Sequence, residues 1–204
     1  MNGVPYEIIV GPMSVYWAAV GATFPAIDAT PAAQDWTLVG TSGSLNYKED
    51  GVTVTHGAEY SRFRALGSTG PRKIFRTTEE QVVRLILADL TLEQYRLALN
   101  GNTVTETAPG VGTAGYRSIG LTRGLDVAQY ALLVRGINRS VYGATYNAQY
   151  QVPVCSQVGA QEVTFRKDEP AGLALDFEAL EDPTESTTAN LFGQLIMGNA
   201  AALT

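Results

Sequence analysis

LALDFEAL, at residues 173–180, alternates between apolar and mostly polar side chains. Successive side chains of a β-strand point to opposite faces of the sheet. We therefore expect Leu173, Leu175 and Phe177 on one face, with Asp176 and Glu178 on the other. A strand with one apolar and one polar face is typical of an antiparallel sheet that has one side in water. The segment thus predicts a two-sided strand of such a sheet.

Residues 141–153 show a second, longer alternation, and other short segments resemble strands. One face would hold Tyr142, Ala144, Tyr146, Ala148 and Tyr150, and the other Thr145, Asn147, Gln149 and Gln151. Further strands are expected at residues 6–10, 15–20, 116–122, 128–136 and 162–166. The chain has 21 glycines spread along it, as is common where turns join many short strands.

The middle of the chain predicts hairpins. Residues 44–48 and 52–56 flank Asp50-Gly51, a strong hairpin signal because glycine adopts a positive φ without steric cost. Residues 59–65 and 72–77 follow as two more strands, separated by the turn-like segment 67–71.

Residues 91–100 are the clearest helix. Thr91 and Gln94 have the spacing of a capping box, in which each side chain satisfies the other's backbone N–H. Gly101 stands where a left-handed residue ends many helices. The preceding residues 78–90 suit a buried strand or a helix, because periodicity cannot decide so short an apolar run. Local sequence slightly favours the helix.

Composition limits the functions to consider. Only 17% of residues are charged, the formal net charge is −6 and the pI is near 4.8, which argues against a protein that grips phosphates with a basic face. Cys155 is the only cysteine, so no internal disulfide is possible and a reducing cytoplasm is the simplest compartment. We expect neither a secretory signal nor a membrane span, because no apolar run approaches about 20 residues.

Residues able to carry chemistry are few. His56 is the only histidine, nothing around Cys155 resembles a nucleophile site, and one His with one Cys cannot form a zinc site. We therefore predict no catalytic residues, no metal and no cofactor. Acidic pairs occur at residues 49–50, 79–80, 168–169 and 181–182, and leave a small carboxylate-dependent hydrolase as a remote alternative.

The order of several motifs resembles the tail tube proteins, or major tail proteins, of long-tailed phages. The motifs are WTLVG at 36–40, Asp50-Gly51-Val52, Gly70-Pro71, the apolar run 78–90, the helix opened by Thr91-Leu92-Glu93, and Leu180-Glu181-Asp182-Pro183. The likeness covers roughly residues 10–183.

The resemblance implies a mostly β fold of two packed antiparallel sheets, sandwich- or barrel-like, with one flanking α-helix. Residues 1–204 would form one tail-tube domain, in which 78–90 is a strand. Rings, usually hexameric, would stack into a hollow channel for DNA at ejection; the tube protein of type VI secretion systems shares that fold. Residues 21–35 would be an inter-ring loop and residues 184–204 a C-terminal arm. The expected inter-ring contacts are Phe24, Pro25, Ile27, Leu191, Phe192, Leu195 and Ile196.

The lumen of such a tube would be lined by Glu162, Asp176 and Glu178, with Thr145, Asn147 and Gln149 as a neutral alternative. An acidic wall would repel passing phosphates, so DNA would not be bound specifically. The implied partners are other copies of the chain, the tail initiator or baseplate, the tape-measure protein and the tail terminator. The protein would be made in the host cytoplasm and reside in the virion tail. The alternative is another ring-forming virion part or secretion tube.

Overall fold

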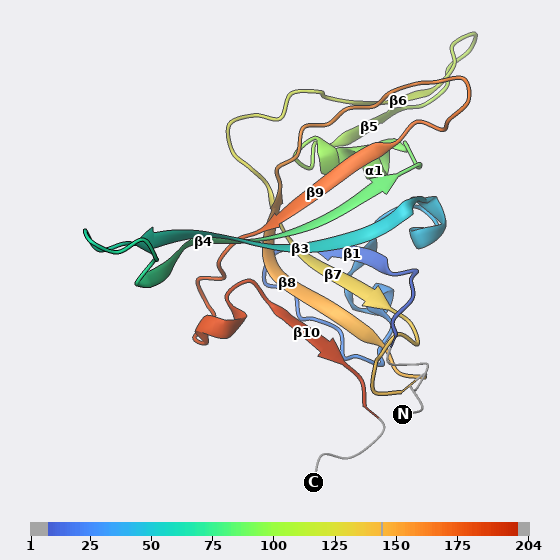
Figure 1. The fold of residues 1–204 in the computed structure, drawn as a ribbon. Coiled ribbons are helices and arrows are strands. Elements are labelled where there is room, and N and C mark those ends of the chain that lie inside the picture. Colours follow the sequence, from blue (N-terminus) through green and yellow to red (C-terminus); the bar gives the residue numbers. More distant parts are fainter. Residues whose placement is uncertain (1–7, 144, 200–204) are drawn as a thin grey trace.

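The computed structural model describes residues 8–143 and 145–199. Within them the chain forms one large antiparallel sheet, a small second sheet and an α-helix (Figure 1), so the predicted mostly β fold class is confirmed. The elements are β1 Ser14–Ala18, β2 Thr37–Leu38, β3 Tyr47–Phe63, β4 Lys73–Leu87, α1 Leu92–Ala98, β5 Val104–Thr107, β6 Tyr116–Ile119, β7 Gln129–Gly136, β8 Ala148–Gln157, β9 Leu173–Ala179 and β10 Gln194–Met197. Short 3-10 turns occupy Pro31–Gln34, Gly43–Asn46 and Thr188–Asn190.

The large sheet has the strand order β2-β1-β7-β8-β9-β4-β3, and β10 also pairs with β8. Strand β8 joins two parts of this sheet. Its first residues pair with β7 and β10, whereas Cys155, Ser156 and Gln157 at its end also pair with β9. The group β9-β4-β3 and the group β1-β7-β8-β10 are therefore connected along a single strand (Figure 1).

The core lies where side chains of both strand groups meet. Leu85 of β4, Leu132 of β7 and Leu175 of β9 are each at most 1% exposed and belong to the same apolar cluster. The alternation of LALDFEAL is confirmed, because Leu173, Leu175 and Phe177 are buried while Asp176 and Glu178 are only partly covered. Helix α1 completes this cluster with its fully buried Leu97 and Ala98.

Strands β3 and β4 differ from the predicted short hairpins. Residues 73–87 are one strand, which confirms the strand interpretation of 78–90 as far as Leu87. The prediction of a hairpin turn at Asp50-Gly51 is wrong, because β3 continues through these two residues and pairs with β4 before and after them. Residues 48–51 of β3 instead lie opposite the single residue Ile86 of β4, so that they form a bulge in β3. Gly51 has φ 65°, so its conformational freedom serves this bulge rather than a turn.

Helix α1 is confirmed, and so is the left-handed conformation of Gly101, with φ 73°. The capping box is wrong, because the Thr91 side chain makes no cap hydrogen bond. Gln94 Oε1 accepts instead from the Gly40 N–H at 2.9 Å, and the carboxylate of Asp89 accepts from the Thr91 N–H at 3.0 Å. The helix is thus capped from the preceding turn and tied to a distant loop.

Two predicted strands are absent from the described structure, and a third is shorter than expected. Residues 162–166 are irregular, and so are residues 8–10; residues 6 and 7 lie outside the described part. Strand β8 begins only at Ala148, because the Tyr146 N–H closes a turn onto the Gly143 carbonyl at 3.1 Å. Alternation of side chains alone did not reveal that turn.

Candidate assembly surfaces

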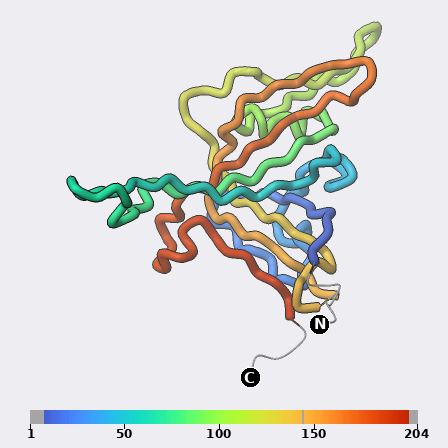
Figure 2. Tube along the Cα trace, viewed as in Figure 1, coloured from blue at the N-terminus to red at the C-terminus, as the bar shows by residue number. Residues whose placement is uncertain are grey.

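The most prominent surface feature is the hairpin formed by β3 and β4, which extends well beyond the rest of the molecule (Figures 1 and 2). Strand β4 pairs with β9 only over residues 82–87, so residues 73–81 have only β3 as a neighbour. Every residue from 58 to 63 and from 73 to 80 is exposed. The far half of the hairpin therefore covers no part of its own subunit's core.

Apolar side chains are concentrated on this projecting segment. Its exposed large apolar residues are Tyr60, Phe63, Leu66, Ile74 and Phe75, with exposed fractions between 45% and 102%. Single exposed apolar residues are ordinary, but a contiguous group of them marks a surface that contacts another molecule. The hairpin tip, defined here as residues 60–76, is such a surface.

The hairpin tip is also basic. It contains Arg62, Arg64, Arg72, Lys73 and Arg76, which are five of the 14 basic residues, and none of the 20 acidic residues. Arg76 pairs with Glu79 at 2.9 Å. The other four have no carboxylate partner among the described residues, although the Lys73 ammonium lies 5.0 Å from the ring centre of Phe75. The net charge of −6 over the whole chain hides this local excess of basic residues.

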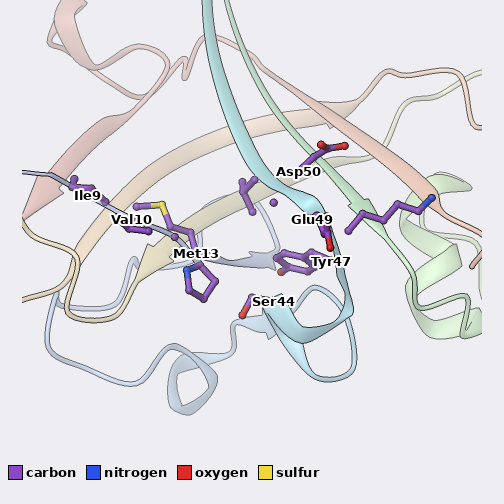
Figure 3. A pocket seen from close by; sticks show the side chains of 12 residues that line it. Ile9, Val10, Met13, Ser44, Tyr47, Glu49 and Asp50 are labelled. Atoms are coloured by element: carbon purple, nitrogen blue, oxygen red, sulfur yellow. The ribbon is translucent and has the colours of Figure 1, made fainter. Parts of the chain in front are cut away.

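A groove of about 560 Å³ lies at the opposite end of β3, beside the N-terminal segment (Figure 3). Its apolar lining includes Ile9, Val10, Pro12, Met13, Tyr47 and Val52. Glu49 and Asp50, in the bulge of β3, supply its carboxylates. Neither of them accepts a hydrogen bond or ion pair from any described residue. We call this hollow the base groove.

Tyr47 fixes the wall of the base groove. Its hydroxyl donates to the Val39 carbonyl at 2.9 Å and accepts from the Val15 N–H at 3.0 Å. Burial raises the pKa of Tyr47 above its usual value, so the hydroxyl stays a donor at neutral pH. The neighbouring Lys48 forms an ion pair with Glu169. Its charge is therefore already matched, unlike those of the two groove carboxylates.

The predicted lumen residues are partly brought together. Asp176 and Glu178 share the outer face of β9, where Asp176 pairs with Arg84 of β4 at 3.3 Å. Glu162 is exposed on an irregular segment and lines the same shallow hollow as Arg84. Their lumen role remains a prediction. The neutral alternative is wrong for Gln149, because this side chain is 0% exposed.

The predicted inter-ring loop, residues 21–35, is irregular, as expected, but lies against its own subunit. The buried guanidinium of Arg135 donates to the carbonyls of Ala26 and Ala29 and to Gln149. Gln149 Nε2 in turn donates to the Pro25 carbonyl at 3.1 Å. Burial lowers the pKa of Arg135.

The proposed contacts in this loop differ in availability. Pro25 is buried, which contradicts its expected role as an inter-ring contact in this conformation. Phe24 packs against Trp36, with ring centres 4.9 Å apart, and the Asn147 side chain donates to the Ile27 carbonyl. Contacts by Phe24 and Ile27 with another ring remain predictions. The loop does not project.

The expected C-terminal arm also differs from the structure. Residues 194–197 form β10, which pairs with β8 of the same subunit, because the backbone there finds a free sheet edge. Phe192 packs against the main core, and the Leu191 carbonyl accepts from the Asp182 N–H at 2.9 Å. The prediction of a C-terminal arm is therefore wrong for residues 191–197, while residues 200–204 lie outside the described part. Leu195 keeps 43% of its surface exposed, and Ile196 is half-buried.

The side chains considered for catalysis are far from forming a shared site. His56 is exposed on β3, whereas Cys155 is 0% exposed in the core. Burial raises the pKa of the Cys155 thiol to about 12, so it is protonated at neutral pH. Across residues 8–143 and 145–199, no three His, Cys, Asp or Glu side chains cluster closely enough to hold a metal ion.

In the same described ranges, no helix is both long and apolar enough to cross a membrane. No protein-family model matches the sequence, and no curated protein matches it significantly.

Proposed function

We propose that this chain is a structural subunit of a phage-type tail tube, which associates with copies of itself into rings that stack around a channel for DNA. The observation that carries the proposal is the β3–β4 hairpin, which extends from the body with exposed apolar side chains. A segment of this kind has no function in stabilising an isolated subunit. Its aromatic and aliphatic surface is accounted for if neighbouring copies cover it.

The sheet edges support the same proposal. Strand β3 is at one end of the large sheet, and over its 17 residues no strand of the described ranges 8–143 and 145–199 pairs with its outer edge. Exposed edges of that length invite pairing with another chain, and a barrel shared between copies removes them. A contact between unlike surfaces of identical copies produces closed rings or open filaments. Rings and stacks can therefore both arise from one subunit.

The partners of the proposed subunit are foremost its own copies. By the resemblance to tail tube proteins, the tail initiator or baseplate, the tape-measure protein and the tail terminator would join the ends and interior of the tube. DNA would pass through without specific binding, which agrees in sign with the net charge of −6. The assembled protein would reside in the virion tail after synthesis in the host cytoplasm.

Negative-stain electron microscopy of the concentrated full chain tests the proposal directly. We expect rings or tubes, either from the chain alone or after addition of the tail initiator and tape-measure proteins. A variant in which residues 60–76 are replaced by Asn-Gly should remain a folded monomer. A single ring that never elongates would indicate a connector instead. A wild-type chain that stays monomeric in every condition, with those partners present, would refute self-assembly.

A further inference from the structure

We propose that the hairpin tip of one copy docks into the base groove of the next copy. The tip is residues 60–76, and the groove is formed by residues 9–13 and the start of β3, including Glu49 and Asp50. This inference rests on the proposed self-assembly and names the two surfaces that would make the contact.

Charge complementarity is the first argument. The tip carries five basic residues and no acidic ones, so the rest of the chain has nine basic against 20 acidic residues, a formal net charge of −11. A subunit divided in this way attracts the tip of another copy and repels its body. Within the acidic body, Glu49 and Asp50 lie next to each other in the lining of one groove, and both are exposed with no polar partner among the described residues.

The alternative acidic groove is less suited to the tip. It lies between residues 20–24 and 180–184, with Glu181 and Asp182 at its border. Asp182 already accepts hydrogen bonds from the Thr184 N–H at 2.8 Å and from the Thr184 hydroxyl at 2.7 Å. These bonds lower the pKa of Asp182 and occupy its oxygen. The carboxylates of the base groove are not engaged in this way.

Apolar surfaces match as well. Phe63 and Leu66 near the turn of the tip are 55% and 102% exposed. The base groove presents Val10 and Met13 from the N-terminal segment beside its carboxylates (Figure 3). Ile9 and Val10 are 37% and 68% exposed in the isolated subunit. A docked tip would cover both sets of apolar atoms while its arginines meet Glu49 and Asp50.

The position of the two surfaces makes the contact intermolecular. They lie at opposite ends of the same strand pair, with the tip on the projecting side (Figure 1). Strands rise about 3.3 Å per residue, so Tyr60 lies roughly 26 Å from Val52, too far for a tip to reach its own groove. Each copy therefore offers one free tip and one free groove, and the contact can repeat from copy to copy.

Charge reversal tests the proposed pair of surfaces. The tip variant Arg62→Glu/Arg64→Glu and the groove variant Glu49→Lys/Asp50→Lys should each reduce sedimentable assemblies at least tenfold while keeping the circular dichroism of the wild type. A chain with all four substitutions should recover assembly, because the attraction is restored with reversed signs. The matched control, Glu181→Lys/Asp182→Lys, should assemble like the wild type.

The outcomes separate this inference from the proposed function. If the wild type forms tubes but the control variant fails and the groove variant assembles, the tip docks elsewhere and the inference is overturned. If the tip and groove variants both assemble normally, the inference also fails while self-assembly stands. If the four-substitution chain does not recover, charge pairing between these two surfaces is refuted.

A cysteine pair gives an independent readout of proximity. Leu66→Cys in the tip and Ser44→Cys beside the base groove are introduced into separate chains, which are mixed and oxidised during assembly. We expect a disulfide-linked dimer of the two variants, which neither variant forms alone in comparable yield. The native Cys155 is buried and leaves the background low. A mixture that gives no more linked dimer than each variant alone would contradict the docking.

Discussion

Replacing Tyr47 with Phe should destabilise the subunit by about 2–4 kcal/mol. The hydroxyl that is lost bonds the Val15 N–H and the Val39 carbonyl, and both of these residues are 0% exposed. An unsatisfied buried donor or acceptor costs about 1–3 kcal/mol, and the removed hydroxyl no longer has to be buried itself. Two orphaned groups sum to about 2–6 kcal/mol, and the hydroxyl that need no longer be desolvated reduces the net loss to the lower half of that range, about 2–4 kcal/mol. No cavity forms, since the ring remains.

Urea unfolding followed by circular dichroism measures this change, with Tyr60→Phe as the control. Tyr60 is 48% exposed on the hairpin, so its variant should differ from the wild type by less than about 0.5 kcal/mol. A Tyr47→Phe loss no larger than that of the control would show that the two hydrogen bonds do not hold β1 to the start of β3. The raised pKa of Tyr47 adds a second check: wild-type stability should fall as the pH rises above about 10, and the variant should lose less.

Three further perturbations address the loop, the core thiol and the helix start. Gln149→Leu should cost about 1–3 kcal/mol and expose residues 21–35 to proteolysis, whereas unchanged cleavage would show that the loop is held by other contacts. Cys155, buried and with its pKa raised to about 12, should resist a thiol reagent until urea unfolds the chain; labelling of the native chain at the unfolded rate would contradict its burial. Although partial burial acts the other way, hydrogen bonds from Thr41 and Thr91 lower the pKa of Asp89. The ionised carboxylate therefore adds to the free energy of unfolding above pH about 3.9, and this stabilisation should be lost as the pH falls below it. Asp89→Asn should therefore flatten the acid side of the stability profile, and a profile identical to the wild type would contradict this.

Strands whose pattern is set by their own neighbours could be predicted from sequence. Residues 173–180 alternate because one face meets the core, and the structure buries Leu173, Leu175 and Phe177 as expected. The helix at 91–100 was predictable for a similar reason, since its ending at Gly101 depends on one local backbone angle. These signals lie within a few residues of the feature that they specify.

Features that depend on distant partners could not be predicted in the same way. A glycine with positive φ suits a hairpin turn and a bulge equally. Only the pairing of Tyr47 with Leu87 and of Val52 with Leu85, on either side of Gly51, decides for the bulge. The length of the projecting hairpin depends on where β9 stops pairing with β4, at Val82 opposite Glu178. Nothing in residues 57–80 themselves indicates that boundary.

The candidate site was only partly visible in the sequence. The sequence shows that residues 60–76 are basic, but only the pairing of β3 with β4 shows that these residues form one projecting tip. The base groove joins residues 9–13 to residues 47–52, and no local pattern links them. The sequence predicts a hairpin turn at Asp50-Gly51, and nothing in that local pattern places Glu49 and Asp50 beside residues 9–13.

The pairing of β10 with β8 also sets an order of events during synthesis. A ribosome makes the chain from its N-terminus, so residues 148–151 exist well before residues 194–197, which later cover their edge. During that interval a nascent chain presents a bare strand that another nascent chain could take by mistake. Once β10 is made, it pairs with this edge of β8. Aggregation of nascent chains should therefore increase when translation across residues 158–193 is slowed.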